Sequence, residues 1–123
     1  MLKEIKLKFA KVNIYYNYMV VVMNEGIHFS PDLNSILEDI VSQHFYDRLF
    51  VYITYRKNSY SVDPVIYKYT SKIHNLAGFA VVTKENIAKK NAEIEKLFLK
   101  KPFEIFNKLD DAIVWAKSIL KNK

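Results

Sequence analysis

The sequence predicts a single α/β domain with a mixed sheet of five strands and four helices. Short, continuous apolar runs alternate along the chain with longer segments in which apolar residues recur every three or four positions. The first pattern is typical of buried strands and the second of amphipathic helices. Strands that alternate with helices pair in parallel, with the helices as crossovers. We find no internal repeat, linker or low-complexity segment, so one domain covers residues 1–123.

The first two strands are expected to form an antiparallel hairpin. Apolar and charged residues alternate over residues 5–14, which predicts a half-buried strand, and the alternation slips at Ala10. A β-bulge or a bend near Ala10 would explain the slip. Residues 15–17 are expected to form a turn. The apolar, valine-rich run 18–23 then predicts a central second strand that is buried on both faces.

Seven further elements follow from the same patterns. Ser30-Pro31 and Asp63-Pro64 are typical starts of helices, with a capping side chain followed by proline in the first turn. In chain order we expect a helix at 30–44, a strand at 49–55, a helix at 63–74, a strand at 76–82, a helix at 86–99, a strand at 103–106 and a helix at 109–119. In the third helix, four apolar side chains are expected to face the core: Ile87, Ile94, Leu97 and Phe98.

The positive charge of the chain does not indicate nucleic-acid binding. The net charge is +6, but of the 19 basic residues only Arg48 and Arg56 are arginines, and the lysines are spread along the whole chain. Base readout and bidentate phosphate contacts favour arginine. We therefore expect a solvated lysine surface and no nucleic-acid partner.

Compartment signals favour a cytoplasmic protein. The absence of cysteine excludes disulfides, thiol catalysis and thiolate metal sites. Charged and apolar residues alternate over residues 1–8, so we expect no signal peptide. The longest apolar run, residues 18–23, is much shorter than the ~20 residues that cross a bilayer. We therefore expect a protein that does not span a membrane.

Motifs for a cofactor or a metal are not found in the sequence. Glycine occurs only at positions 26 and 78, so neither a phosphate-binding loop nor a dinucleotide fingerprint can be built. The three histidines stand singly at positions 28, 44 and 74, without the ligand spacing of a zinc site. We expect no cofactor and no metal.

The clustered acidic residues are explained by helix stability. Asp110 and Asp111 fit the first turn of the last helix, where the helix dipole favours carboxylates. Glu93 and Glu95 lie among lysines, and we expect them to form solvated ion pairs on a helix face. These residues do not indicate catalysis, and we expect the chain not to be an enzyme.

Three stretches of the sequence are similar to one protein family. Residues 102–106 read Pro-Phe-Glu-Ile-Phe, residues 109–115 read Leu-Asp-Asp-Ala-Ile-Val-Trp, and residues 58–64 read Asn-Ser-Tyr-Ser-Val-Asp-Pro. Together with the predicted order of elements, they resemble the STAS domains of bacterial anti-sigma-factor antagonists and their uncharacterised SpoIIAA-like relatives. The resemblance spans nearly the whole chain and implies the STAS (SpoIIAA-like) fold.

The resemblance also implies the place of a regulatory site. In anti-sigma-factor antagonists, a kinase phosphorylates a serine or threonine at the start of the helix after the third strand, in a run of Asp, two Ser or Thr residues and Gly. Ser59 and Ser61 lie in the corresponding region, which lacks that run and has no glycine. The resemblance therefore implies the location of an interaction or phosphorylation site, and not the activity.

The predicted sheet leads to the same location. In open α/β sheets, ligands meet the carboxyl ends of the parallel strands. The candidate site residues at that edge are Glu25, Tyr55, Arg56, Asn58, Ser59, Ser61 and Lys84. The start of the second helix faces the same edge and would suit an anion. We expect Arg56 either to pair with Glu25 or to receive an anion.

The sequence leaves two main hypotheses for the function of this edge. The leading hypothesis is a non-enzymatic regulatory module that binds a protein partner at this edge. The alternative is a carrier of a small apolar ligand or lipid, with a pocket lined by tyrosines and by Met19 or Met23. Six tyrosines crowd the third strand and its flanks, where they either pack in the core or form such a surface: Tyr46, Tyr52, Tyr55, Tyr60, Tyr67 and Tyr69.

An enzyme ranks third, because no nucleophile and base can be paired from the sequence alone. Oligomeric state stays open. The first strand is expected at an edge of the sheet, where Lys6 and Lys8 would discourage pairing with another chain, and a homodimer through the helices is compatible with the sequence.

Overall fold

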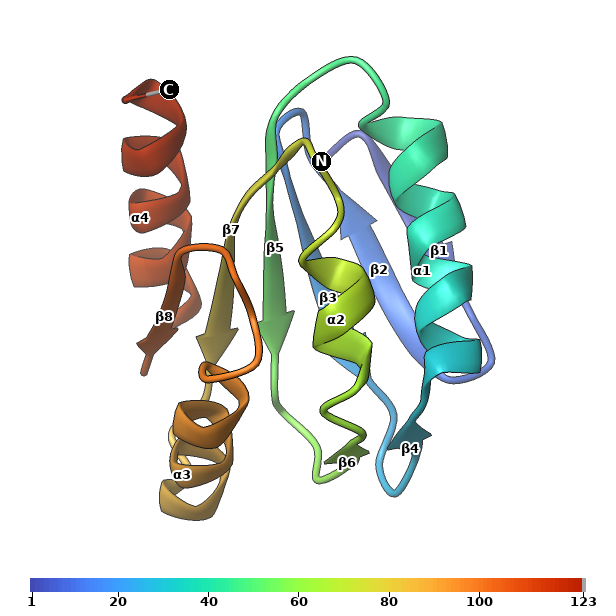
Figure 1. Cartoon of the computed structure of the whole chain (residues 1–123), viewed down its shortest axis with the longest axis vertical. Coiled ribbons are helices and arrows are strands. Elements are labelled where there is room, and N and C mark those ends of the chain that lie inside the picture. The colour runs from blue at the N-terminus through green and yellow to red at the C-terminus, as the bar shows by residue number, and fades with distance from the viewer. Residues whose placement is uncertain (123) are drawn as a thin grey trace.

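The computed structural model describes residues 1–122, and it is built around a six-stranded sheet with helices on both faces (Figure 1). The strands of this sheet, in spatial order, are β1 (Lys3–Lys6), β2 (Ala10–Ile14), β3 (Tyr18–Met23), β5 (Phe50–Tyr55), β7 (Leu76–Val82) and β8 (Phe103–Phe106). A second, two-stranded sheet consists of β4 (His28–Phe29) and β6 (Ser61–Val62). The helices are α1 (Pro31–His44), α2 (Ile66–Thr70), α3 (Asn86–Glu95) and α4 (Leu109–Lys121).

The main sheet is mixed, as the sequence predicts. β1, β2 and β3 pair antiparallel, whereas β3, β5, β7 and β8 pair in parallel through helical crossovers. The prediction of five strands is wrong by one. The slip at Ala10 is a chain reversal and not a bulge, because the Leu7 N–H donates to the Ala10 carbonyl over 2.8 Å and closes a turn between β1 and β2.

Helix boundaries follow the capping residues only in part. α1 begins after Ser30, whose hydroxyl accepts a 3.5 Å hydrogen bond from the Leu33 N–H, and it ends at His44 as expected. The second helix is shorter than predicted. Asp63 accepts a 3.1 Å hydrogen bond from the Val65 N–H and holds a turn, so that α2 begins only at Ile66. α3 also ends early, at Glu95.

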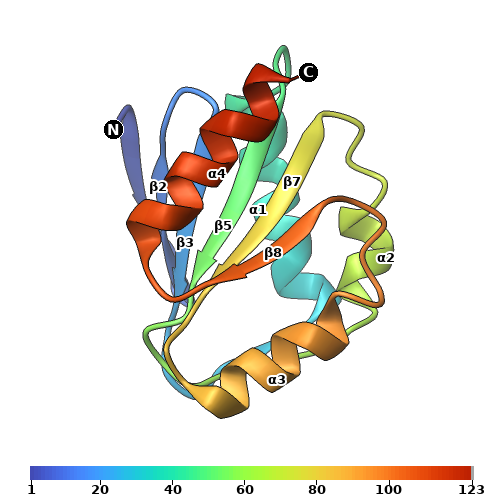
Figure 2. The same cartoon turned by 90° about the vertical axis from the view of Figure 1, so that its left-hand side faces the viewer.

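The helices divide between the two faces of the sheet. α1 and α2 cover one face and α4 covers the other, as Figure 2 shows with α4 in front. Successive strand residues point to opposite faces of the sheet. Met19 and Tyr52 pack in the core under α1 and α2, whereas Val20 and Ile53 pack in the core under α4. α3 covers neither face, because it lies across the end of the sheet where the parallel strands finish (Figures 1 and 2).

α4 packs closely on β7 because Gly78 has no side chain. A Cβ built at this position would lie 2.5 Å from Ile119 Cδ1 and 2.9 Å from Trp115 Cη2. Ala112 and Ala116 on the same side of α4 are fully buried. Small residues on both elements therefore allow the helix to lie directly on the sheet.

Candidate functional site

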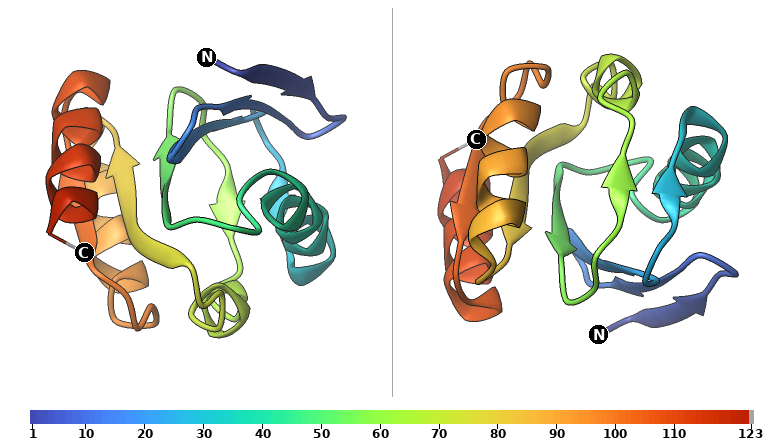
Figure 3. Two further views of the ribbon diagram at one scale, coloured as in Figure 1. Left: turned by 90° about the horizontal axis from the view of Figure 1, so that it is seen from above. Right: turned by 90° about the horizontal axis from the view of Figure 1, so that it is seen from below.

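The carboxyl ends of β3, β5 and β7 meet at one edge of the sheet, which we call the carboxyl edge (Figure 3, right). The loops that follow β3 and β5 join there through the β4–β6 ribbon. The Gly26 N–H donates to the Ser59 carbonyl over 2.7 Å, and the Ser61 N–H donates to the Ile27 carbonyl over 3.1 Å. The two loops therefore form one ordered surface.

Three predicted site residues hold these loops together. Glu25 accepts a 2.9 Å hydrogen bond from the backbone N–H of Ser59. The side-chain amide of Asn58 donates to the Met23 carbonyl over 2.9 Å. The structure thus brings Glu25, Asn58 and Ser59 together, as the sequence predicts, and their contacts stabilise the loop geometry.

Arg56 forms a buried ion pair with Glu95. The two side chains are each only 7% exposed and make a bidentate contact, with Arg56 Nη1 2.9 Å from Glu95 Oε2 and Nη2 bonded to Oε1. The Tyr67 hydroxyl donates to the same carboxylate. The prediction that Arg56 pairs with Glu25 or stays free for an anion is wrong, and so is the prediction that Glu95 is solvated. Paired charges are the form in which a protein interior tolerates ions.

The low dielectric around this pair shifts the neighbouring pKa values. Burial disfavours the charged form of Arg56, but Tyr60 and Glu95 outweigh it and hold the pKa of the guanidinium above its usual value. Burial, with a contribution from the Glu95 carboxylate, raises the pKa of Tyr67 well above that of a free phenol. Burial likewise raises the pKa of Tyr52. Each phenol therefore stays protonated well above neutral pH.

A groove runs between α3 and the loop after β5. One part of it, about 290 Å³ in volume, lies between Lys57 and Ser59 on the loop and Ile87 on the helix. The adjoining part, about 260 Å³, lies between Pro64 and Ile94. Both parts share Arg56, Tyr60 and Asn91 along their walls, so they are adjacent parts of one grooved surface at the carboxyl edge.

Of the three remaining predicted site residues, Ser61 lines the second part of the groove, whereas Tyr55 and Lys84 lie beside the groove and not in it. Tyr55 packs with the core on the α4 side of the sheet, and the Lys57 ammonium lies 4.9 Å from the centre of its ring. Lys84 is exposed directly after β7, where the Thr83 hydroxyl accepts a 3.2 Å hydrogen bond from the Glu85 N–H. Both residues are at the predicted edge.

His28 and Ser61 form a contact that the sequence did not reveal. His28 Nδ1 lies 2.6 Å from Ser61 Oγ across the β4–β6 ribbon, and both residues are exposed. A serine paired with a histidine is the beginning of a nucleophile and base. Among residues 1–122, however, no carboxylate hydrogen-bonds to His28 to orient its ring.

Phosphorylation of Ser59 or Ser61 stays a prediction.

Within residues 1–122, the space that Met23 and the tyrosines surround on one face of the sheet is smaller than a carrier's ligand needs. Met19 and Met23 are buried, and the space among Met23, Tyr52, Tyr60 and Tyr67 has a volume of about 10 Å³. This is about the size of one water molecule. Ligand pockets are typically ~300 Å³ or more, so the tyrosines on this face of the sheet serve as core packing.

α3 has the orientation opposite to the one predicted. Ala92, Glu95 and Leu99 are buried, whereas the four side chains expected inward are exposed: Ile87, Ile94, Leu97 and Phe98. The spacing of 92, 95 and 99 is itself helical, and it was the available signal for the correct face. Glu95 is charged, so the sequence favours an exposed position for it. Its partner Arg56 lies 39 residues away and cannot be identified from the local pattern.

Residues 1–122 contain no candidate metal site and no candidate membrane-spanning helix. No group of three His, Asp or Glu residues in that range lies close enough to hold a metal ion. The helices described there are too short or too polar to cross a bilayer.

These features define an α/β domain with the SpoIIAA-like fold. The structure is similar to that of an uncharacterised protein of the DUF3478 family with a SpoIIAA-like fold from Shewanella loihica PV-4, with a TM-score of 0.59. The similarity covers 87% of this chain and 91% of that chain at 8% sequence identity, which shows the fold. No protein-family model matches the sequence, and a search of curated proteins finds no match.

Proposed function

We propose that this chain is a non-enzymatic interaction module that binds a protein partner at the carboxyl edge, in the cytoplasm. The observation that carries the proposal is the groove of about 290 Å³ beside the exposed apolar side chains of α3, Ile87 and Ile94. Ile87 lines the groove and is 76% exposed. Apolar surface of this kind is typical of a protein contact.

The chemistry of the edge supports binding over catalysis. Glu25 and Asn58 are engaged in hydrogen bonds that fix the loops, and Arg56 and Glu95 neutralise each other. These contacts tie the four side chains to the loops and to α3, and in the described part of the chain none of the four is bonded to a serine hydroxyl. They give the surface a fixed shape, which lowers the entropy cost of binding.

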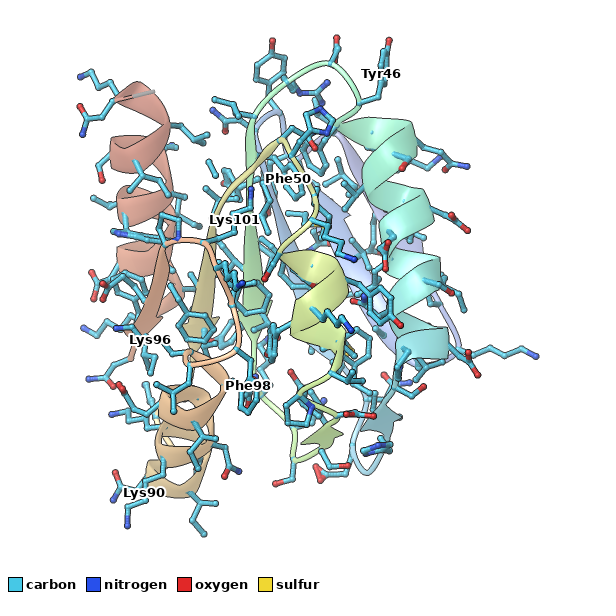
Figure 4. All side chains as sticks on the ribbon, viewed as in Figure 1. Tyr46, Phe50, Lys90, Lys96, Phe98 and Lys101 are labelled. Atoms are coloured by element: carbon cyan, nitrogen blue, oxygen red, sulfur yellow. The ribbon has the colours of Figure 1, made fainter. Side chains whose placement is uncertain are left out.

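Site-specific photocrosslinking in cells tests the proposal. A photoreactive amino acid replaces Lys57 or Lys84 at the carboxyl edge, and Tyr46 serves as the control. Tyr46 is 72% exposed and lies at the opposite end of the molecule (Figure 4). We expect discrete protein adducts from positions 57 and 84 and none from position 46. Equal adducts at both ends, or none at the edge, would contradict the proposal.

The absence of catalysis has its own test at Ser61. A fluorophosphonate reagent labels serines that a histidine activates. Because the His28 ring is exposed and no carboxylate among the described residues hydrogen-bonds to it, we expect no labelling of the folded protein. Labelling that disappears in Ser61→Ala and in His28→Ala would instead assign hydrolase chemistry to this pair.

A further inference from the structure

The outer side of α3 and the turn after it expose four large apolar side chains. The exposed fractions are 76% for Ile87, 54% for Ile94, 82% for Leu97 and 49% for Phe98. Ile87 and Ile94 are seven residues apart, which places them on one stripe of α3, and Leu97 and Phe98 follow in the turn after the helix. An apolar stripe of this kind normally faces a core, and here it faces outward.

These side chains do not hold the helix in place. Ala92 and Leu99 pack into the core, and Glu95 pairs with Arg56. Polar residues at the exposed positions would leave those contacts intact and would be better solvated. Exposed apolar groups that the fold does not need indicate a surface that another molecule covers.

The groove gives this surface a concave shape. Ile87 lines its first part and Ile94 its second, and the seven positions from one to the other span about 10 Å along a helix. Tyr60, Val62 and Pro64 line the facing side. The dimensions suit a segment of polypeptide that lies alongside α3.

The charge of this region favours an acidic occupant. Residues 84–101 contain six lysines and three glutamates: Lys84, Lys89, Lys90, Lys96, Lys100, Lys101, Glu85, Glu93 and Glu95. Glu95 is neutralised by Arg56, which leaves an excess of positive charge over this stretch of the chain, while Glu25 and Glu85 line the first part of the groove. Figure 4 shows Lys90 at the lower end of α3, and Lys96 and Phe98 near its upper end. Complementary charge steers a partner of the opposite sign toward the surface.

We propose that the groove and the outer side of α3 bind an acidic amphipathic segment of a partner protein, an inference that rests on the function proposed above. Its apolar residues cover Ile87, Ile94 and Leu97, and its carboxylates lie against the flanking lysines. This is the helix-in-groove mode of recognition. A lysine-flanked apolar helix also suits an anionic membrane surface. The concave wall formed by Ile87 and Ile94 favours a chain segment over a flat bilayer.

Peptide display tests the chemistry of the partner. The purified protein selects binders from a randomised library of ~16-residue peptides, long enough for about four helical turns. The double variant Ile94→Gln/Leu97→Gln serves for counter-selection, because both positions are exposed and the substitutions leave the core unchanged. We expect enriched peptides with apolar residues at helical spacing and an excess of Asp and Glu.

Synthetic copies of the enriched peptides are then measured by fluorescence anisotropy. We expect Ile94→Gln to weaken binding by about tenfold or more, as for the loss of a central apolar contact. Lys90→Gln should weaken it severalfold, with the loss reduced at high salt, and Tyr46→Ala should leave it unchanged. Thermal unfolding verifies that each variant is folded.

Three results would overturn the inference: no enriched peptide, enriched peptides without an acidic bias, or binding that Ile94→Gln does not weaken. Vesicles that contain phosphatidylglycerol provide the second arm. Vesicle binding that depends on Ile94 and Leu97, without peptide binding, would assign the surface to a membrane. The crosslinking at positions 57 and 84 is independent of these outcomes. Adducts there combined with a failed selection would overturn only the acidic partner, whereas failure of both would overturn the proposed function.

Discussion

α3 and α4 flank the same short strand, β8, and use their apolar residues in opposite ways. α4 turns its small and apolar residues onto the sheet, with Ala112 and Ala116 fully buried. α3 turns its larger apolar residues outward and buries Glu95 in an ion pair. Both segments have a helical pattern of apolar residues, yet only α4 follows the usual orientation. The comparison indicates that α4 is held by packing, whereas α3 is held by the packing of Ala92 together with the buried ion pair of Glu95.

The largest expected effect comes from breaking the contact that anchors α3. Arg56→Met leaves the Glu95 carboxylate buried without its cation, and removing one partner of a buried pair costs ~3–5 kcal/mol. We expect a loss of stability of this size in urea unfolding. The double variant Arg56→Met/Glu95→Leu is the control, since it removes both charges and should recover most of the loss. A change below ~1 kcal/mol in Arg56→Met would show that the pair does not anchor the helix.

Two neighbouring leucines sharpen the contrast between the faces of this segment. Leu99 is 7% exposed and belongs to the core, whereas Leu97 is 82% exposed. We expect Leu99→Ala to destabilise the protein by ~2–5 kcal/mol, as for a buried leucine. Leu97→Ala should change the stability by no more than ~0.5 kcal/mol. Equal losses in the two variants would mean that Leu97 packs against the fold.

Gly78 tests the packing of α4. The added methyl group of Gly78→Ala overlaps Ile119 Cδ1 and Trp115 Cη2, and overpacking of this kind costs ~1–3 kcal/mol. Thermal unfolding should show the loss. Ile119→Val removes the closest of these atoms, so the double variant should be less destabilised than the sum of the two single variants. Strict additivity would indicate that α4 shifts away from β7 as a unit.

The smallest expected effect is on how stability depends on pH in the alkaline range, and it arises from Tyr67, which lies beside the Arg56–Glu95 pair. Burial and the Glu95 carboxylate raise the pKa of Tyr67 in the folded chain, whereas the unfolded chain has the usual value near 10. The contribution of Tyr67 to stability is therefore fully present below about pH 10 and is lost as the pH rises above it. We expect Tyr67→Phe to reduce the loss of stability between about pH 9 and pH 11 in urea unfolding. An unchanged dependence on pH would mean that Tyr67 ionises as freely in the folded chain as in the unfolded one.

The sequence allowed the fold to be predicted wherever local signals agree with the tertiary structure. The runs 18–23 and 76–82 became interior strands, because continuous apolar residues suit a sheet covered on both sides. Ser30 and Pro31 marked the start of α1 for local reasons of capping. The hairpin at Ala10 was misread as a bulge, since both change the phase of alternation and only strand pairing distinguishes them.

The candidate site, like the fold, is predicted from the sequence only in part. The sequence by itself determined which residues lie at the carboxyl edge, because the order of strands and helices fixes where each parallel strand ends. Only the tertiary structure decided which groups meet there. The bond between Arg56 and Glu95 joins residues far apart in the chain, and this bond turns the apolar side of α3 outward. A buried charge must find its counter-charge, and the position of that counter-charge in space is not encoded in the local pattern of residues.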